Sequence, residues 1–272
     1  MEEQGRRGNV ITVFSTASAV GKTLVAINMA AELARLGYHV CLVDVDLQFG
    51  DVCNYLHLEP ERTIADAQRM MEMNADAFDV SQFLDVYRCD AISFSVMASP
   101  LRLDEAYNMS TSAVQQILQQ LQFRFDFVVV DTTSAFSETN LMIMDMSTII
   151  TFLGIVDFIP TIKNMKIGCD TIHSLGYDSA KIRLVLNRSN SKTKIDLEDV
   201  ENILGEPFYH ILSNDFRAAW DATMAGVPLV RTADTALARD LRALVARYTN
   251  LQVEDERVED TGMSSWFKRI FN

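Results

Sequence analysis

One short stretch of the sequence combines the residue types that bind nucleotide phosphates. Residues 20–23 read Val-Gly-Lys-Thr and follow an apolar run, NVITVFS, that predicts a strand. A lysine and a hydroxyl residue at the start of a helix supply a cation for the β- and γ-phosphates and an oxygen ligand for Mg²⁺. Unpaired backbone N–H groups at that helix start also favour an anion. The predicted nucleotide-binding residues of this loop are Ser18, Ala19, Val20, Gly21, Lys22, Thr23 and Leu24.

Gly-Lys-Thr on its own is weak support for such a site, because it is also a plausible polar start of a helix. The full pattern G-x-x-x-x-G-K-[ST] places a glycine where this chain has Thr16. Aspartates at predicted strand ends strengthen the interpretation. Asp44 and Asp46 close the run CLVDVD, and Asp131 closes FDFVVVD. In an open α/β sheet such side chains face the crevice in which ligands bind, and Asp131 has the form of a Walker B residue that holds Mg²⁺.

Apolar runs alternate with helical patterns along the chain, which predicts a doubly wound α/β fold with a mostly parallel sheet and helices on both faces. The predicted strands are Val10–Phe14, Val40–Val43, Ile92–Met97, Phe127–Val130, Ser147–Phe152, Ile182–Leu186 and Phe208–Leu212. The predicted helices are Lys22–Leu36, Ser112–Gln122, Phe158–Leu175, Leu197–Leu204, Phe216–Ala225 and Ala236–Tyr248. No pattern assigns residues 59–88, although RMMEMNADAF (69–78) favours a helix face.

The composition bounds the class of protein and of partner. The chain has 272 residues, 49% of them hydrophobic, which is enough for one large α/β domain. Its net charge of −13 repels the nucleic-acid backbone, so we expect no nucleic-acid partner. The start, MEEQGRRGN, lacks the apolar core of a signal peptide, and no apolar run is long enough for a membrane span. We therefore expect a cytoplasmic body.

The combination of GKT, D-x-D and a later VVVD resembles the MinD/ParA family of deviant P-loop ATPases. The similarity extends over most of the chain and includes LVAINMAAELARLGYHVCLVDVDLQFGDVCNYL and ILSNDFRAAWDATMAGVPLV. The stretch ASPLRLDEAYNMSTSAVQQILQQLQFRFDFVVVDTT is similar to the CpaE/TadZ-like branch, which is associated with pilus assembly and polar localisation. The resemblance implies a P-loop NTPase fold, ATP and Mg²⁺ as cofactors, a homodimer and an unidentified protein partner.

Residue roles carry over from the resemblance position by position. Lys22 and Thr23 would bind phosphate and Mg²⁺, and Asp44 and Asp131 would complete the metal shell. Asp46 would orient the attacking water, so Asp46 and Lys22 are the expected catalytic residues. The strand LVLNRSN resembles the family's adenine-recognition strand, where Asn187 would read the base edge. The resemblance thus implies that Asn187 and Arg188 both bind the nucleotide.

The loop departs from the family pattern K-G-G-x-G-K-[ST] at three positions. Ala17 replaces the signature lysine, which in the family reaches the phosphates of a partner subunit, and Ser18 and Ala19 replace glycines. Small side chains still allow the backbone to approach phosphate. In other phosphoryl-transfer systems, a cation beside the developing phosphoryl charge increases the rate by a factor of about 10³–10⁵. We therefore expect nucleotide binding with slow hydrolysis, unless another cation compensates, or no hydrolysis.

The C-terminal residues form a separate pattern. After the domain at 1–252, residues 253–262 form an acidic linker and residues 263–272 predict an amphipathic helix. A membrane-binding helix on the inner face of the cell membrane is the favoured interpretation, as in MinD members of the family. The alternatives are that the helix folds back on the domain or packs on a partner. The predicted membrane-binding residues are Trp266, Phe267, Lys268, Arg269, Ile270 and Phe271.

Three functions remain open at this stage. The first is a nucleotide-switched ATPase that localises a partner at the membrane. The second is a metabolic enzyme that activates a small carboxylate, for which DTTSAFSETN (131–140) could supply substrate-binding groups. The third is a scaffold that does not hydrolyse ATP. An electron-transfer role is disfavoured because Cys89 and Cys169 match no cluster-binding pattern.

Overall fold

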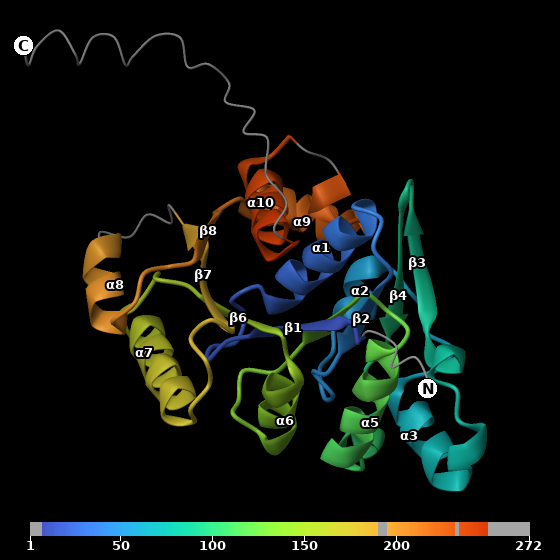
Figure 1. Cartoon of the computed structure of the whole chain (residues 1–272). Coiled ribbons are helices and arrows are strands. Elements are labelled where there is room, and N and C mark those ends of the chain that lie inside the picture. Colours follow the sequence, from blue (N-terminus) through green and yellow to red (C-terminus); the bar gives the residue numbers. More distant parts are fainter. Residues whose placement is uncertain (1–6, 190–194, 232–233, 250–272) are drawn as a thin grey trace, which may run out of the picture.

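The apolar runs of the sequence form the buried strands of one sheet (Figure 1). The computed structural model describes residues 7–189, 195–231 and 234–249. The sheet has eight strands in the order β3-β4-β2-β5-β1-β6-β7-β8, all parallel except β3, which is antiparallel to β4. The strands are β1 (Asn9–Phe14), β2 (Val40–Asp44), β3 (Asp85–Cys89), β4 (Ile92–Met97), β5 (Phe127–Asp131), β6 (Ile149–Gly154), β7 (Ile182–Ser189) and β8 (His210–Ser213).

Helices cover both faces of this sheet. α1, α2 and α10 pack on one face, while α3, α5, α6 and α7 pack on the other (Figure 1). The helices are α1 (Lys22–Arg35), α2 (Val52–Leu56), α3 (Ile64–Met73), α4 (Leu103–Tyr107), α5 (Thr111–Gln122), α6 (Glu138–Met146), α7 (Ile159–Ser174), α8 (Leu197–Leu204), α9 (Phe216–Ala225) and α10 (Ala236–Thr249). This arrangement confirms the predicted doubly wound, mostly parallel α/β fold. Among the described residues, no helix combines the length and apolarity needed to cross a membrane.

Every predicted strand and helix is present, with small shifts at the ends. The strand predicted at Ser147–Phe152 is Ile149–Gly154, and the one at Phe208–Leu212 is His210–Ser213. The structure adds β3, α2, α4 and α6, which no pattern predicted, and α3, of which only the C-terminal part falls in the helix face expected over 69–78. Most of these elements are short, so their periodicity is too brief to detect.

The unassigned segment 59–88 contains α3, two single-turn 3₁₀ helices (Ala75–Ala77 and Val80–Phe83) and most of β3. A capping box starts α3, since Thr63 and Asp66 bond reciprocally there. The helix face expected over 69–78 ends at Met73, whose side chain is exposed. Met70 and Met71 of the helix pack against the core, and so does Phe78 beyond its end.

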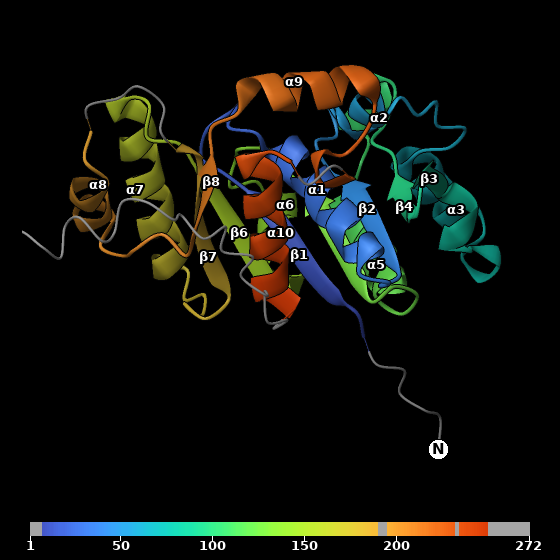
Figure 2. The ribbon, with the colours of Figure 1, turned by 90° about the horizontal axis from the view of Figure 1, so that it is seen from above.

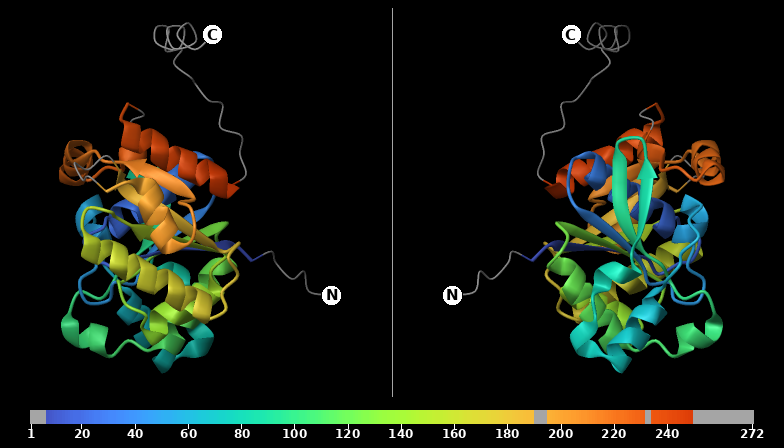
Figure 3. Two further views of the ribbon diagram at one scale, coloured as in Figure 1. Left: turned by 90° about the vertical axis from the view of Figure 1, so that its left-hand side faces the viewer. Right: turned by 90° about the vertical axis from the view of Figure 1, so that its right-hand side faces the viewer.

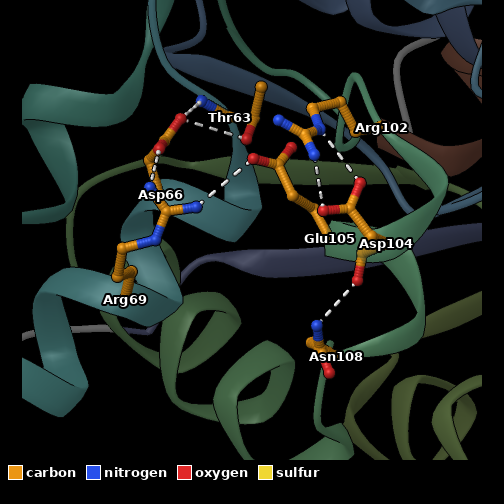
Figure 4. Close-up of polar contacts among 7 residues, drawn as sticks. All are labelled: Thr63, Asp66, Arg69, Arg102, Asp104, Glu105 and Asn108. Carbon is orange, nitrogen blue, oxygen red and sulfur yellow. Dashed lines mark hydrogen bonds and ion pairs between the residues drawn. The ribbon is translucent and has the colours of Figure 1, made fainter.

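Polar contacts link α3 to the segment around α4 (Figure 4). Arg69 of α3 lies 3.2 Å from an Asp66 oxygen and 3.3 Å from a Glu105 oxygen on α4. Arg102 makes a two-pronged contact with Asp104 at the start of α4. Because at least one side chain of each pair is solvent-exposed, the pairs add little stability, about 0–1 kcal/mol each. The Arg69–Glu105 pair joins α3 to α4, while the other two contacts lie within one segment each.

The sheet register brings particular side chains together at one edge. Asp44 at the end of β2 pairs in register with Asp131 at the end of β5, and Asp131 also pairs with Val13 of β1. β1 runs into the loop before α1, so this loop and both aspartates share the carboxyl edge. Figure 2 shows α2 and α9 along the same edge, and the two helices contact each other. The β3–β4 hairpin and the α7–α8 pair lie at opposite sides of the molecule (Figure 3).

Candidate nucleotide site

The loop between β1 and α1 adopts the shape of an anion-binding loop. Gly21 precedes α1 with φ +98°, and Ala19 has φ +58°, so two left-handed residues turn the backbone. The first helical hydrogen bond runs from the Val25 N–H to the Gly21 carbonyl at 3.0 Å. The N–H groups of Lys22, Thr23 and Leu24 therefore lack helical acceptors and are available to an anion. A Cβ at position 21 would lie 2.7 Å from the Asn187 Nδ2 atom, so glycine is required there.

Two buried carboxylates lie beneath this loop. Asp44 and Asp131 are each 1% exposed. The Asp131 Oδ1 atom is buried and has no hydrogen-bond partner within the protein, although the Thr23 hydroxyl bonds to this carboxyl group. A buried, unpaired carboxylate oxygen beside a hydroxyl is suited to a hard cation such as Mg²⁺.

The ionisation of this pair is strongly perturbed. Burial raises the pKa of the Asp131 carboxyl from 3.8 to about 7, although the Thr23 hydrogen bond and the Lys22 charge oppose the increase. Burial, and secondly the Asp131 charge, raises the pKa of Asp44 well above its usual value. A divalent cation would relieve both effects by compensating the negative charge.

The described residues contain no group of three His, Cys, Asp or Glu side chains arranged to hold a metal by itself. Mg²⁺ commonly takes one or two carboxylates and completes its shell with water and nucleotide phosphates. The residues present therefore fit a magnesium ion that binds together with a nucleotide, with Asp131 and the Thr23 hydroxyl on the protein side.

Asp44 holds the loop that follows β2. Its Oδ1 accepts from the Asp46 N–H and its Oδ2 from the Val52 N–H at the start of α2, both at 3.1 Å. Asp46 in turn accepts from the Phe49 N–H at 3.3 Å. Both oxygens of Asp44 thus bond to backbone N–H groups, while Asp46 lines the cavity above the phosphate loop. The predicted roles of Asp44 in the metal shell and of Asp46 in orienting water stay predictions.

Lys22 extends across the cavity to the loop after β5. Its Nζ donates to the Ser134 hydroxyl at 2.8 Å, and that hydroxyl donates to the Ala17 carbonyl at 2.8 Å. Ser134 therefore holds the lysine near the position where the phosphates would lie. No sequence pattern selects Ser134 as the partner of Lys22, because the two residues are 112 positions apart.

Two adjoining cavities flank the phosphate loop. A cavity of about 830 Å³ is lined by the phosphate loop, the loop after β2 and the loop after β5. A second cavity, of about 410 Å³, lies between α1, the end of β7 and α9. Gly21 and Arg188 line both cavities. The larger cavity suits a phosphate chain and the smaller one a nucleoside.

Asn187 lines the smaller cavity, and both polar atoms of its amide bond to the backbone. Its Nδ2 donates to the Val20 carbonyl at 2.8 Å, and its Oδ1 accepts from the Arg188 N–H at 2.9 Å. Asn187 is 4% exposed. Its predicted contact with the base stays a prediction, and in the absence of a base it holds β7 against the phosphate loop.

Sequence reasoning missed several residues of the smaller cavity. They come from the end of β8 and from α9, a segment that was noted for its family resemblance and not for any chemistry. Phe216 and Trp220 stack there with ring centroids 6.2 Å apart, and both rings are substantially exposed. Two aromatic residues four positions apart on one helix could have drawn attention to this wall.

Residues 11–223 match the CbiA family, described as the CobQ/CobB/MinD/ParA nucleotide binding domain. The chain belongs to this family. The predicted MinD/ParA resemblance is thereby confirmed, while the CpaE/TadZ-like branch stays a prediction. The membrane-binding residues expected at 266–271, like the linker and helix expected over 253–272, lie outside the described residues.

Known proteins of the MinD/ParA type resemble the chain over most of its length. It is 27% identical over 237 residues to the septum site-determining protein MinD of Synechocystis, with 81% of each chain covered. It superposes on a ParA family ATPase from Chlorobium tepidum with a TM-score of 0.79, at 16% identity, covering 88% of this chain and 98% of that one. MinD from Pyrococcus horikoshii in complex with Mg-ADP gives a TM-score of 0.74, at 18% identity, covering 89% and 96%. These two structures therefore have the same fold as this member of the CbiA family.

The perturbed carboxyl pair predicts an unusual dependence of stability on pH. A carboxyl group with a raised folded-state pKa makes the fold less stable as pH rises from about 4 towards that pKa. Asp131→Asn removes one buried charge, so at pH 8 without Mg²⁺ it should increase the free energy of unfolding by up to about 4 kcal/mol, because a pKa raised from 3.8 to about 7 corresponds to about 1.4 kcal/mol for each pH unit. At pH 4 the two proteins should be nearly equal in stability. Thermal unfolding at both pH values measures this difference, and an Asp131→Asn variant that is less stable than wild type at pH 8 contradicts it.

Proposed function

We propose that this chain is an ATP-binding switch of the MinD type, which forms a homodimer with ATP and Mg²⁺ and localises a protein partner at the membrane. The observation that carries the proposal is the phosphate loop above a buried carboxylate whose Oδ1 has no partner, at Asp131. The proposal places ATP in the two adjoining cavities and Mg²⁺ between Thr23 and Asp131. The Mg-ADP complex of the Pyrococcus horikoshii relative supports these cofactors.

The loop after β5 favours the switch over the metabolic enzyme. Its polar groups already have partners within the protein: Thr132 donates to the Val13 carbonyl, Thr133 accepts from Asn140, and Ser134 bridges to the phosphate loop. Ser137 caps α6. Few groups of residues 131–140 are left to recognise a carboxylate substrate, whereas a loop bonded to the nucleotide lysine can respond to the nucleotide.

The finer parts of the proposal rest on the sequence. The name of the Synechocystis relative, a septum site-determining protein, supports a localising role. The CpaE/TadZ-like stretch favours a partner in pilus assembly, and residues 263–272 would bind the membrane surface. The net charge of −13 disfavours a nucleic-acid partner. The alanine at position 17 favours slow turnover, with a scaffold that does not hydrolyse ATP as the limiting case.

Binding of ATP depends on Lys22 if the loop holds phosphates. Lys22→Ala removes a charge-assisted contact, so affinity for MgATP should fall on the order of 100-fold. Isothermal titration calorimetry measures it, with Lys163→Ala, an exposed lysine of α7 outside both cavities, as the matched control. Equal ATP affinity in wild type and Lys22→Ala would refute the assignment of the phosphate loop.

Turnover should be slow and should depend on Asp46. Wild type should hydrolyse ATP far below the ~10 s⁻¹ typical of enzymes, because position 17 carries no charge. Asp46→Ala should keep ATP affinity within about threefold and abolish turnover, since its carboxylate would orient the water. Ala17→Lys should raise turnover. A phosphate-release assay measures all three, and brisk wild-type hydrolysis without partner or lipid contradicts the interpretation of Ala17.

Membrane binding should require the C-terminal residues and ATP together. One short helix binds a lipid surface weakly, while two helices on one dimer can bind about 10²–10⁴ times more tightly. In liposome co-sedimentation with anionic lipid, ATP should increase binding, and Trp266→Glu or truncation after Asp260 should abolish it. Phe123→Glu is the matched control, because it replaces an exposed aromatic side chain of the domain by the same acidic residue. It should leave liposome binding unchanged. Equal sedimentation of the truncated protein rules out the tail as an anchor.

A further inference from the structure

Arg188 has a backbone conformation that is unfavourable for a large side chain. Its φ is +56°, in the left-handed region, although it directly follows Asn187 within β7. Any residue with a Cβ is disfavoured in this region, and such outliers concentrate at functional sites. The conformation requires compensating contacts from the surrounding structure.

Those contacts direct Arg188 towards the phosphate loop. The Asn187 Oδ1 accepts from the Arg188 N–H at 2.9 Å, which fixes the turn. The guanidinium NH2 then donates to the Ala19 carbonyl at 2.7 Å. Ala19 is itself left-handed, so two strained residues from segments 169 positions apart meet at this contact.

The larger cavity offers few positive charges to a phosphate chain. Among the described residues that line it, Lys22 and Arg188 are basic, while Asp46 and Asp51 are acidic. A triphosphate with one Mg²⁺ still carries a charge of roughly −2 near pH 7, so each cation that contacts the phosphates directly matters against this acidic lining. Arg188 also lines the smaller cavity, so it lies where phosphates would join the nucleoside.

We propose that Arg188 is a phosphate-binding residue, whose guanidinium exchanges the Ala19 carbonyl for the phosphate chain of a nucleotide held in the same subunit. This inference rests on the proposed nucleotide-binding function. The exchange is favourable because a guanidinium bonds a phosphate through two N–H groups with charge assistance, whereas the carbonyl is a single neutral acceptor. The chain would thus supply from β7 a cation that position 17 lacks.

The test separates a phosphate contact from a structural brace. Arg188→Gly keeps the left-handed backbone without strain and removes the charge, and Arg188→Gln removes the charge alone. Both should lower MgATP affinity about 10–100-fold in isothermal titration calorimetry. The nucleotide-free Arg188→Gly protein should unfold at the wild-type temperature or above it. Arg217→Gln is the matched control, since Arg217 is 94% exposed on α9 and lines neither cavity.

Two results overturn the inference. One is MgATP affinity of Arg188→Gln within threefold of wild type. The other is an Arg188→Gly protein that loses both thermal stability and affinity, which marks Arg188 as a brace between β7 and the loop. If wild type itself fails to bind MgATP, the proposed function fails and the inference falls with it. If Lys22→Ala loses affinity and Arg188→Gln does not, only the inference is wrong.

Discussion

The burial of two like charges at neighbouring strand ends is the constraint on which this carboxyl edge depends. Asp44 and Asp131 face each other in register between β2 and β5, and neither is accessible to water. Such a pair is unfavourable unless hydrogen bonds or a cation compensate it. Asp44 obtains two backbone N–H donors, whereas Asp131 retains an oxygen without a partner. Because the Asp131 oxygen has no donor, a cation fits beside Asp131 better than beside Asp44.

The hydrogen bond that Asp44 accepts from α2 also links the carboxylate pair to the smaller cavity. The Asp44 Oδ2 accepts from the Val52 N–H at the start of α2, and His57 follows the last residue of α2. The His57 ring packs so closely against Gly226, at the end of α9, that a Cβ there would lie 2.7 Å from it. The Tyr87 hydroxyl fixes the Gly226 carbonyl at 2.9 Å. α2 therefore connects the loop after β2 to the helix that forms the wall of the smaller cavity.

The phosphate loop keeps its shape despite the loss of two glycines from the family pattern. Ala19 adopts the left-handed conformation at a cost of about 1–2 kcal/mol, and contacts from Asn187 and Arg188 to the loop hold it in place. Gly21 is retained because a side chain there would meet Asn187. Small side chains can thus replace glycine where the backbone only has to turn, but not where another segment approaches closely. Position 17, where the family pattern has lysine, carries no charge in this chain.

The sequence by itself determined the fold class, the phosphate loop and the aspartates at the strand ends, because each of these features depends on residues that are close together along the chain. Apolar runs of five or six residues predict strands, and a lysine after glycine at a helix start predicts an anion site. Tertiary structure decided the rest. The contacts of Lys22 with Ser134, of Arg188 with Ala19 and of Asp131 with Asp44 join segments far apart in sequence. Their geometry depends on strand order and register, which local patterns do not specify.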